Sequence, residues 1–147
     1  MRARCMQSWS DETSDRPRVV IECGPEASPS IIADVVEREG MAVRTCVGAS
    51  DRRCDLLDNG MCALVSGADV VVNLLGQHHE TGRRIAEAVQ SERRPPGLVV
   101  EVAAGDSPRH DVEFGEPIQL TSPLRSGALL NAIRDALASR GQSTSEP

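Results

Sequence analysis

The feature that most constrains the fold is a continuous apolar run in the middle of the chain. Residues Ala68 to Leu75 read Ala-Asp-Val-Val-Val-Asn-Leu-Leu. A short run of this kind is typical of a parallel strand that helices cover on both faces. Because such a strand needs neighbouring strands and two layers of helices, the run predicts a domain of the α/β class.

Strand and helix patterns alternate before this run. Arg18 to Glu22 predicts strand one, and Met41 to Val47 predicts strand two. Between them, Ser28 and Pro29 are typical of a helix N-cap followed by proline in the first turn, and Gly40 ends the helix. The apolar stripe of this helix is formed by Ile31, Ile32, Val35 and Val36.

The pattern is less regular between strand two and the central run. Asp51 to Leu57 predicts a short helix, and Met61 to Ser66 fits either a further helical turn or an irregular segment. After the central strand, Glu80 to Glu92 predicts a helix, which Pro95-Pro96-Gly97 breaks. Leu98 to Ala104 then predicts strand four.

The last third of the chain completes the sheet. Gly105 to Glu116 has no helical period, so the helix between strands four and five is expected to be reduced to a turn or loop. Ile118 to Thr121 predicts strand five, and Leu124 to Ser139 predicts the last helix. The buried stripe of that helix is expected at Leu129, Leu130, Ile133 and Leu137. The sequence therefore predicts a single doubly wound, flavodoxin-like parallel sheet of five strands in the order 2-1-3-4-5.

Both ends of the chain are polar. Residues 1–17 and 141–147 are rich in small polar and charged residues and are expected to be disordered tails around one domain at residues 18–140. Trp9 falls in the first tail, and the one phenylalanine is Phe114. The core is therefore expected to consist of Val, Leu, Ile and Ala.

Charge and hydropathy exclude several classes of function. All 16 basic residues are arginine, and the net charge is −6, whereas nucleic-acid binding needs a basic face. The scarcity of aromatic rings also excludes a platform for base stacking. No apolar run approaches the roughly 20 residues that span a bilayer, and the N-terminus lacks the apolar stretch of a signal peptide. We expect a cytoplasmic protein that binds neither nucleic acid nor a membrane.

The segment Pro117 to Leu124 and the amphipathic run Ser126 to Leu137 resemble the last strand and last helix of a response-regulator receiver domain. In receivers this strand ends in Lys-Pro, and the lysine contacts the bound phosphoryl group. In this chain Ser122 precedes Pro123, and the sequence contains no lysine. The resemblance covers about Arg18 to Arg140 and rests on the order and spacing of the elements.

The resemblance implies where the reactive positions of a receiver would lie. Strand one of a receiver ends in an acidic pair that binds magnesium, and here Glu22 and Cys23 stand at those positions. Strand three ends in the phospho-accepting aspartate, and here Asn73 or Leu74 occupies that place. Neither residue forms an acyl phosphate, so the nucleophile is missing.

The remaining receiver positions are also altered. Gly82 matches the glycine that usually follows the phospho-accepting strand. Ala103 stands where receivers have Thr or Ser, and Ser122 stands in place of the lysine. Because phosphoryl transfer needs metal, nucleophile and cation together, the resemblance implies a degenerate receiver pocket that is not phosphorylated.

Thiols and imidazoles form a second group of candidate site residues. Cys23 ends strand one, Cys46 lies near the end of strand two, and His78 and His79 follow strand three. Because these strands are neighbours in the predicted order, the four side chains could gather at one edge of the sheet. Thiolate and imidazole ligands suit zinc or an iron–sulfur centre. No Cys-x2-Cys spacing is present, however, so this indication of metal is weak.

Cys54 and Cys62 lie in the crossover between strands two and three. The sequence leaves three roles open for them: metal ligands, a reversible disulfide with each other, or, for Cys62 together with Cys46, small buried apolar residues.

These observations predict a non-enzymatic regulatory domain that binds another protein and needs no cofactor. The altered region Gly105 to Leu124 is expected to carry the interaction surface. The sequence does not identify the partner and also allows a homodimer. Two alternatives remain: a cysteine-based redox or metal sensor, and a flavodoxin-like domain that binds a small molecule near Cys23, Asn73 and His78.

Overall fold

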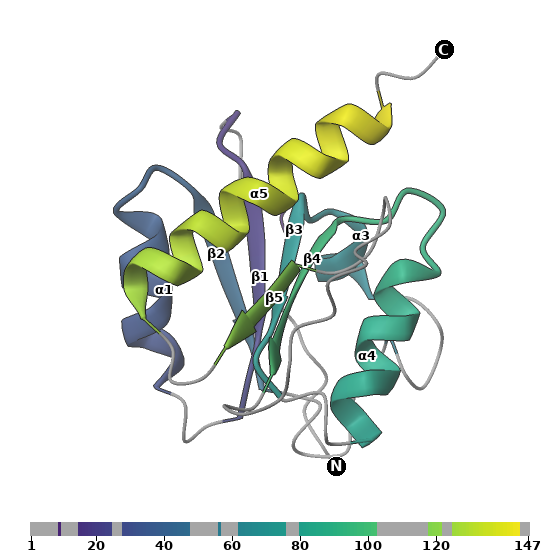
Figure 1. The fold of residues 1–147 in the computed structure, drawn as a ribbon, viewed down its shortest axis with the longest axis horizontal. Helices are drawn as coiled ribbons and strands as arrows, with labels where there is room; N and C mark the ends of the chain where they lie inside the picture. Colours follow the sequence, from purple (N-terminus) through teal and green to yellow (C-terminus); the bar gives the residue numbers. More distant parts are fainter. Residues whose placement is uncertain are drawn as a thin grey trace.

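The sheet has the predicted five strands and the predicted order. The computed structural model describes residues 9, 15–24, 28–47, 56, 62–75, 80–102, 118–121 and 125–144. All strand pairs are parallel, and the order is β2-β1-β3-β4-β5 (Figure 1). The strands are β1 (Arg18–Glu22), β2 (Ala42–Cys46), β3 (Val70–Asn73), β4 (Gly97–Val102) and β5 (Ile118–Thr121). The doubly wound parallel fold is therefore confirmed.

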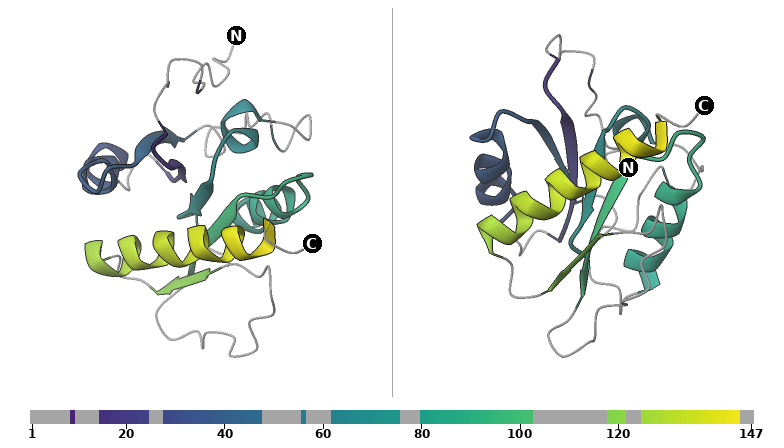
Figure 2. Two further views of the ribbon diagram at one scale, coloured as in Figure 1. Left: turned by 90° about the horizontal axis from the view of Figure 1, so that it is seen from above. Right: turned by 45° about the horizontal axis from the view of Figure 1, so that its top comes forward.

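Helices cover both faces of this sheet. They are α1 (Pro29–Glu37), α3 (Ala63–Ser66), α4 (Glu80–Gln90) and α5 (Ser126–Thr144). The long helix α5 crosses one face of the strands, as two further views also show (Figure 2). The expectation that the chain leaves the helix before Gly141 is wrong, because α5 continues to Thr144. One glycine weakens a helix by only about 1 kcal/mol, and no proline follows until Pro147.

The start of α1 differs from its prediction in two respects. Ser28 precedes the helix, but its backbone is left-handed (φ 54°, ψ 62°) and its side chain makes no capping hydrogen bond. Its carbonyl instead accepts the N–H groups of Ile31 (3.0 Å) and Ile32 (3.3 Å). Pro29 occupies the first turn as predicted. The buried stripe of α1 is narrower than the four residues predicted for it. Ile32 and Val36 are buried, whereas Ile31 is 66% exposed.

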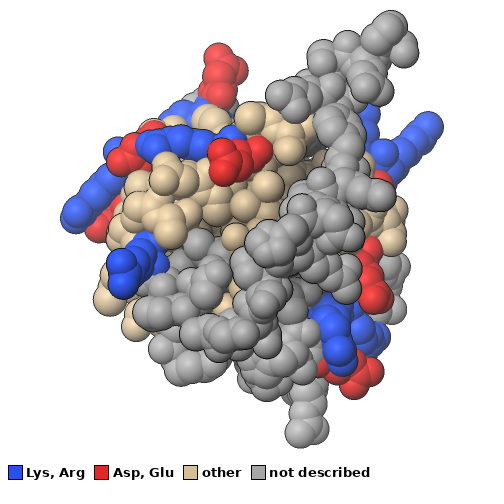
Figure 3. Space-filling model, in the orientation of Figure 1, with Lys and Arg blue, Asp and Glu red and all other residues tan. Residues whose placement is uncertain are grey.

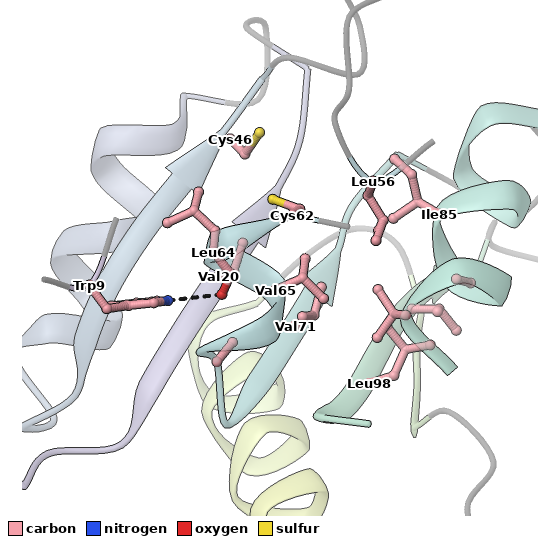
Figure 4. Close-up of a cluster of buried hydrophobic side chains, with 14 of the residues drawn as sticks. Trp9, Val20, Cys46, Leu56, Cys62, Leu64, Val65, Val71, Ile85 and Leu98 are labelled. Carbon is pink, nitrogen blue, oxygen red and sulfur yellow. Dashed lines mark hydrogen bonds between the residues drawn. The ribbon is translucent and has the colours of Figure 1, made fainter. Parts of the chain in front are cut away.

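The core consists of two apolar layers, one on each face of the sheet. Alternate residues of β1 supply both layers, with Val19 and Ile21 on one face and Val20 on the other. The first layer packs against α1 and α5 and includes Val36, Val70, Val72, Val99, Leu129 and Ile133. The second packs against α3 and α4 and includes Leu64, Val65, Val71, Ile85, Val89 and Leu98 (Figure 4). Each buried aliphatic side chain contributes roughly 1.5–3 kcal/mol.

Trp9 belongs to the second layer, which corrects two predictions. Its side chain is only 6% exposed, and its indole N–H donates to the carbonyl of Leu64 at 2.8 Å (Figure 4). Trp9 is therefore neither disordered nor outside the core. An aromatic side chain buries a large apolar area, so the packing of Trp9 contributes to the stability of this layer.

On the face that Figure 3 shows, the described residues include charged side chains of both signs (Figure 3). Arg134 of α5 pairs with Glu39 after α1 at 2.8 Å, and Arg38 pairs with Asp34 at 2.8 Å. Pairs this exposed contribute at most about 1 kcal/mol each. Within the described residues, no helix is long and apolar enough to cross a membrane.

Candidate functional site

Three polar side chains form a row at the carboxyl edge of the sheet, where parallel α/β sheets carry their sites. Glu22 of β1 lies in register with Cys46 of β2 and with Asn73 of β3. Residues in register on neighbouring parallel strands point to the same face. Since Val20 and Cys46 belong to the layer under α3 and α4, this row of Cys46, Glu22 and Asn73 lies on that face.

Asn73 is fully buried, and both ends of its amide are engaged. Its Nδ2 donates to the carbonyl of Gly82 in α4 at 2.8 Å, and its Oδ1 accepts the N–H of Leu75 at 3.1 Å. The side chain therefore ties the end of β3 both to the following loop and to the start of α4. A carboxylate at this position could accept from Leu75 but could not donate to Gly82. Asn73 thus acts as a structural clamp at the end of β3.

Glu22 is a buried acid. The residue is 2% exposed, and its Oε2 has no hydrogen-bond partner among the described residues. Burial raises the pKa of Glu22 from 4.5 to about 7, and the smaller opposing effect is its hydrogen bond with the Cys46 side chain. Desolvation dominates because the apolar layer disfavours the charged form. Glu22 is therefore mostly protonated between about pH 4.5 and about pH 7, where exposed carboxyl groups are already ionised.

Glu22 and Cys23 do not converge on one point. Successive residues of an extended chain face opposite sides of the sheet, and Cys23 packs in the layer under α1 and α5. The N–H of Cys23 bonds to the carbonyl of Cys46 at 3.1 Å. Within the described residues, no three His, Cys, Asp or Glu side chains are placed to hold one metal ion. Ala103 and Ser122, which the resemblance placed in the degenerate pocket, lie outside the described residues.

The structure tests only part of the cysteine hypothesis. Cys46 and Cys62 both lie in the layer under α3 and α4, where they are 7% and 8% exposed (Figure 4). Cys54, His78 and His79 lie outside the described residues, so their role as ligands or disulfide partners stays a prediction. Apolar surroundings disfavour the thiolate, which is the reactive form of cysteine.

We therefore expect the thiols of Cys23, Cys46 and Cys62 to react slowly in the folded protein. All three are buried. Ellman's reagent should label them much more slowly under native conditions than in urea, with the labelled sites identified by peptide mass. Rapid native labelling of Cys46 or Cys62 would contradict this account and favour a thiol sensor.

A groove lies elsewhere on the molecule, between α1 and the edge strand β2. Its volume is about 390 Å³. Its lining includes Pro29, Asp34, Glu37, Val43, Arg44 and Thr45. This groove is at the β2 edge, whereas the alternative of a small-molecule site places that site near Cys23, Asn73 and His78. The sequence gives no indication of this groove, because the residues of α1 and β2 that line it form no recognisable motif.

Sequence reasoning also missed the contact between Trp9 and the crossover. The indication was present, since a lone tryptophan in a polar segment is unusual in a chain with 1% aromatic residues. Its binding place was not identifiable, because Trp9 and Leu64 are 55 positions apart.

Solved receiver domains share the fold of this chain. No family model matches the sequence, and neither does any curated protein. A response regulator receiver domain from Clostridium thermocellum has a TM-score of 0.63 at 15% identity, over 86% of this chain and 98% of that chain. A CheY-like receiver domain from Methanospirillum hungatei has a TM-score of 0.59 at 15% identity, over 87% and 98%.

A receiver domain from Bacillus halodurans gives a similar result, with a TM-score of 0.60 at 12% identity, over 82% of this chain and 97% of that chain. At these identities the likeness shows a shared fold. The receiver-like architecture that the order of elements predicted is therefore confirmed.

Proposed function

We propose that this protein is a regulatory domain with the receiver fold that acts by binding another protein, without phosphoryl transfer. The fold supports a role like that of a response-regulator domain. The observation that carries the second half of the proposal is the Asn73 amide, which donates to Gly82 and accepts from Leu75 inside the core.

The chemistry of the row supports the same conclusion. Phosphoryl transfer needs a nucleophile and electrostatic stabilisation of the transferred group. An amide supplies no such nucleophile. Because the pKa of Glu22 is raised to about 7, Mg²⁺, which prefers charged oxygens, would compete with a proton for this carboxyl group near neutral pH. The chain also has no lysine to contact a phosphoryl group.

A domain without this chemistry would act through its surface. The region Gly105 to Leu124, which we expect to bind the partner, lies mostly outside the described residues. The mechanism would be steric or allosteric, because binding would mask or reposition a partner rather than transfer a group to it.

Incubation with acetyl phosphate and Mg²⁺ tests the proposal. We expect the intact mass of the protein to remain unchanged, while a receiver domain that accepts phosphate from acetyl phosphate gains one phosphoryl group in the same reaction. A stable adduct of one phosphoryl group on this chain would overturn the proposal.

A further inference from the structure

Trp9 occupies a slot built from four residues on the face of the sheet that carries α3. The floor is Gly67 at the end of α3, and the carbonyl of Leu64 accepts the indole N–H at 2.8 Å. The guanidinium groups of Arg18 and Arg44 lie 5.6 Å and 5.1 Å from the centre of the indole ring. We call these four residues the Trp9 slot.

The slot fits a tryptophan side chain by shape. A Cβ atom at Gly67 would lie 2.6 Å from Cδ1 of Trp9, which is closer than real Cβ contacts come. The absence of a side chain at Gly67 therefore gives the ring its space.

The slot also fits tryptophan by polarity. Only tryptophan combines a large aromatic face with a ring N–H that can donate to a carbonyl such as that of Leu64. Two guanidinium groups near the ring add cation–π attraction. The two guanidinium groups lie at the slot together with one carboxylate, that of Asp69, whose Oδ2 accepts the N–H of Arg18 at 2.8 Å. The two positive charges against this one negative charge suit acidic residues beside the tryptophan.

The chain's own segment has this chemistry. In the sequence Trp9 is followed by Ser10, Asp11 and Glu12. We propose that the Trp9 slot is a protein-interaction surface for a tryptophan followed by acidic residues, and that the chain's N-terminal segment fills it as an intramolecular ligand. A partner with the same chemistry would bind by displacing Trp9. This inference rests on the proposed protein-binding function, and its test involves no phosphoryl chemistry.

Fluorescence reads the state of the slot directly, because Trp9 is the only tryptophan and the chain has no tyrosine. In the wild-type protein we expect blue-shifted emission and weak quenching by acrylamide. Gly67→Ala should shift the emission to the red and raise the quenching constant several-fold, with circular dichroism retained. Gly127→Ala is the matched control, because a Cβ there meets nothing within 4 Å. If acrylamide quenches Trp9 fluorescence equally in the wild type and in Gly67→Ala, the proposal that Trp9 occupies this slot is overturned.

Binding in trans tests recognition. A Trp9→Ala full-length variant has neither tryptophan nor tyrosine, so the emission of an added synthetic peptide of residues 1–14 reports only on the peptide. We expect a saturable blue shift when the variant is titrated into a fixed concentration of this peptide. The titration must reach millimolar concentrations of the variant, since a short tether gives an effective concentration on the order of millimolar.

Two controls make the result specific. Binding should weaken when the peptide carries Asp11→Asn and Glu12→Gln, and it should disappear when the variant also carries Gly67→Ala. If the folded Trp9→Ala variant gives no blue shift with the peptide, the proposal that the slot recognises this sequence is overturned.

If Trp9→Ala does not fold, the folded Gly67→Ala variant is used instead. Peptide 1–14 is added to it, and the oxidation of the variant's own Trp9 is measured by mass spectrometry. We expect the peptide to leave this oxidation unchanged, because the added Cβ blocks the slot. Protection of Trp9 by the peptide would contradict a blocked slot.

Discussion

Replacing Asn73 with aspartate should destabilise the protein by about 2–4 kcal/mol at neutral pH. The variant loses the donor to the Gly82 carbonyl, which then lies buried without that partner. It also places a second carboxyl group beside Glu22, one strand away in register and equally buried. Urea denaturation followed by circular dichroism measures the change.

Asn131→Asp is the matched control, since Asn131 lies on the exposed side of α5 and the same chemical change there should cost no more than about 0.5 kcal/mol. If Asn73→Asp and the wild type have the same free energy of unfolding, the role of Asn73 as a structural clamp is contradicted. That result would also indicate that the end of β3 accommodates a charged residue, as a phosphorylated receiver requires.

Glu22 should make the protein less stable as the pH rises. Its pKa is 4.5 when it is unburied and about 7 in the folded protein, so the folded form holds the proton more tightly. This contribution to stability is fully present below pH 4.5 and is lost as the pH rises through about 7. Between these values the free energy of unfolding should fall by about 1.4 kcal/mol per pH unit, or about 3 kcal/mol in all.

Glu22→Gln should remove this dependence, because the amide does not titrate. The difference in unfolding free energy between wild type and Glu22→Gln should change by about 3 kcal/mol between about pH 4 and about pH 8. The wild type loses this stability as the pH rises, whereas the variant does not. Glu87→Gln, on the exposed side of α4, should leave the pH profile of the wild type in place. If the difference in unfolding free energy between wild type and Glu22→Gln does not change with pH, the raised pKa of the buried Glu22 is contradicted.

The order of the strands was predictable because few topologies fit the pattern. The continuous run at Val70–Asn73 requires two covering layers, and right-handed crossovers between successive parallel strands leave a doubly wound sheet as the main solution. Helix ends were less predictable. The end of α5 depends on whether one glycine stops a helix, and the first turn of α1 depends on a left-handed Ser28 that no residue pattern specifies.

The positions of the site residues followed from the topology, but their chemistry did not. Strand ends that are neighbours in the sheet bring Glu22, Cys46 and Asn73 into one row, as the predicted order requires. The opposite facing of Glu22 and Cys23, the raised pKa of Glu22 and the double engagement of Asn73 depend on burial and on distances that sequence spacing does not contain. Trp9 was misplaced for the same reason, because its partner lies 55 positions away.

The proposed function requires that this receiver fold has no working phosphoryl site. An NMR titration of the ¹⁵N-labelled protein with Mg²⁺ and beryllium trifluoride, which mimics a phosphoryl group, tests for such a site. We expect the amide signals of residues 22–24 and 73–75 to keep their positions at saturating reagent. Saturable shifts confined to those signals would show a phosphoryl site at the carboxyl edge of the sheet and would overturn the proposed function.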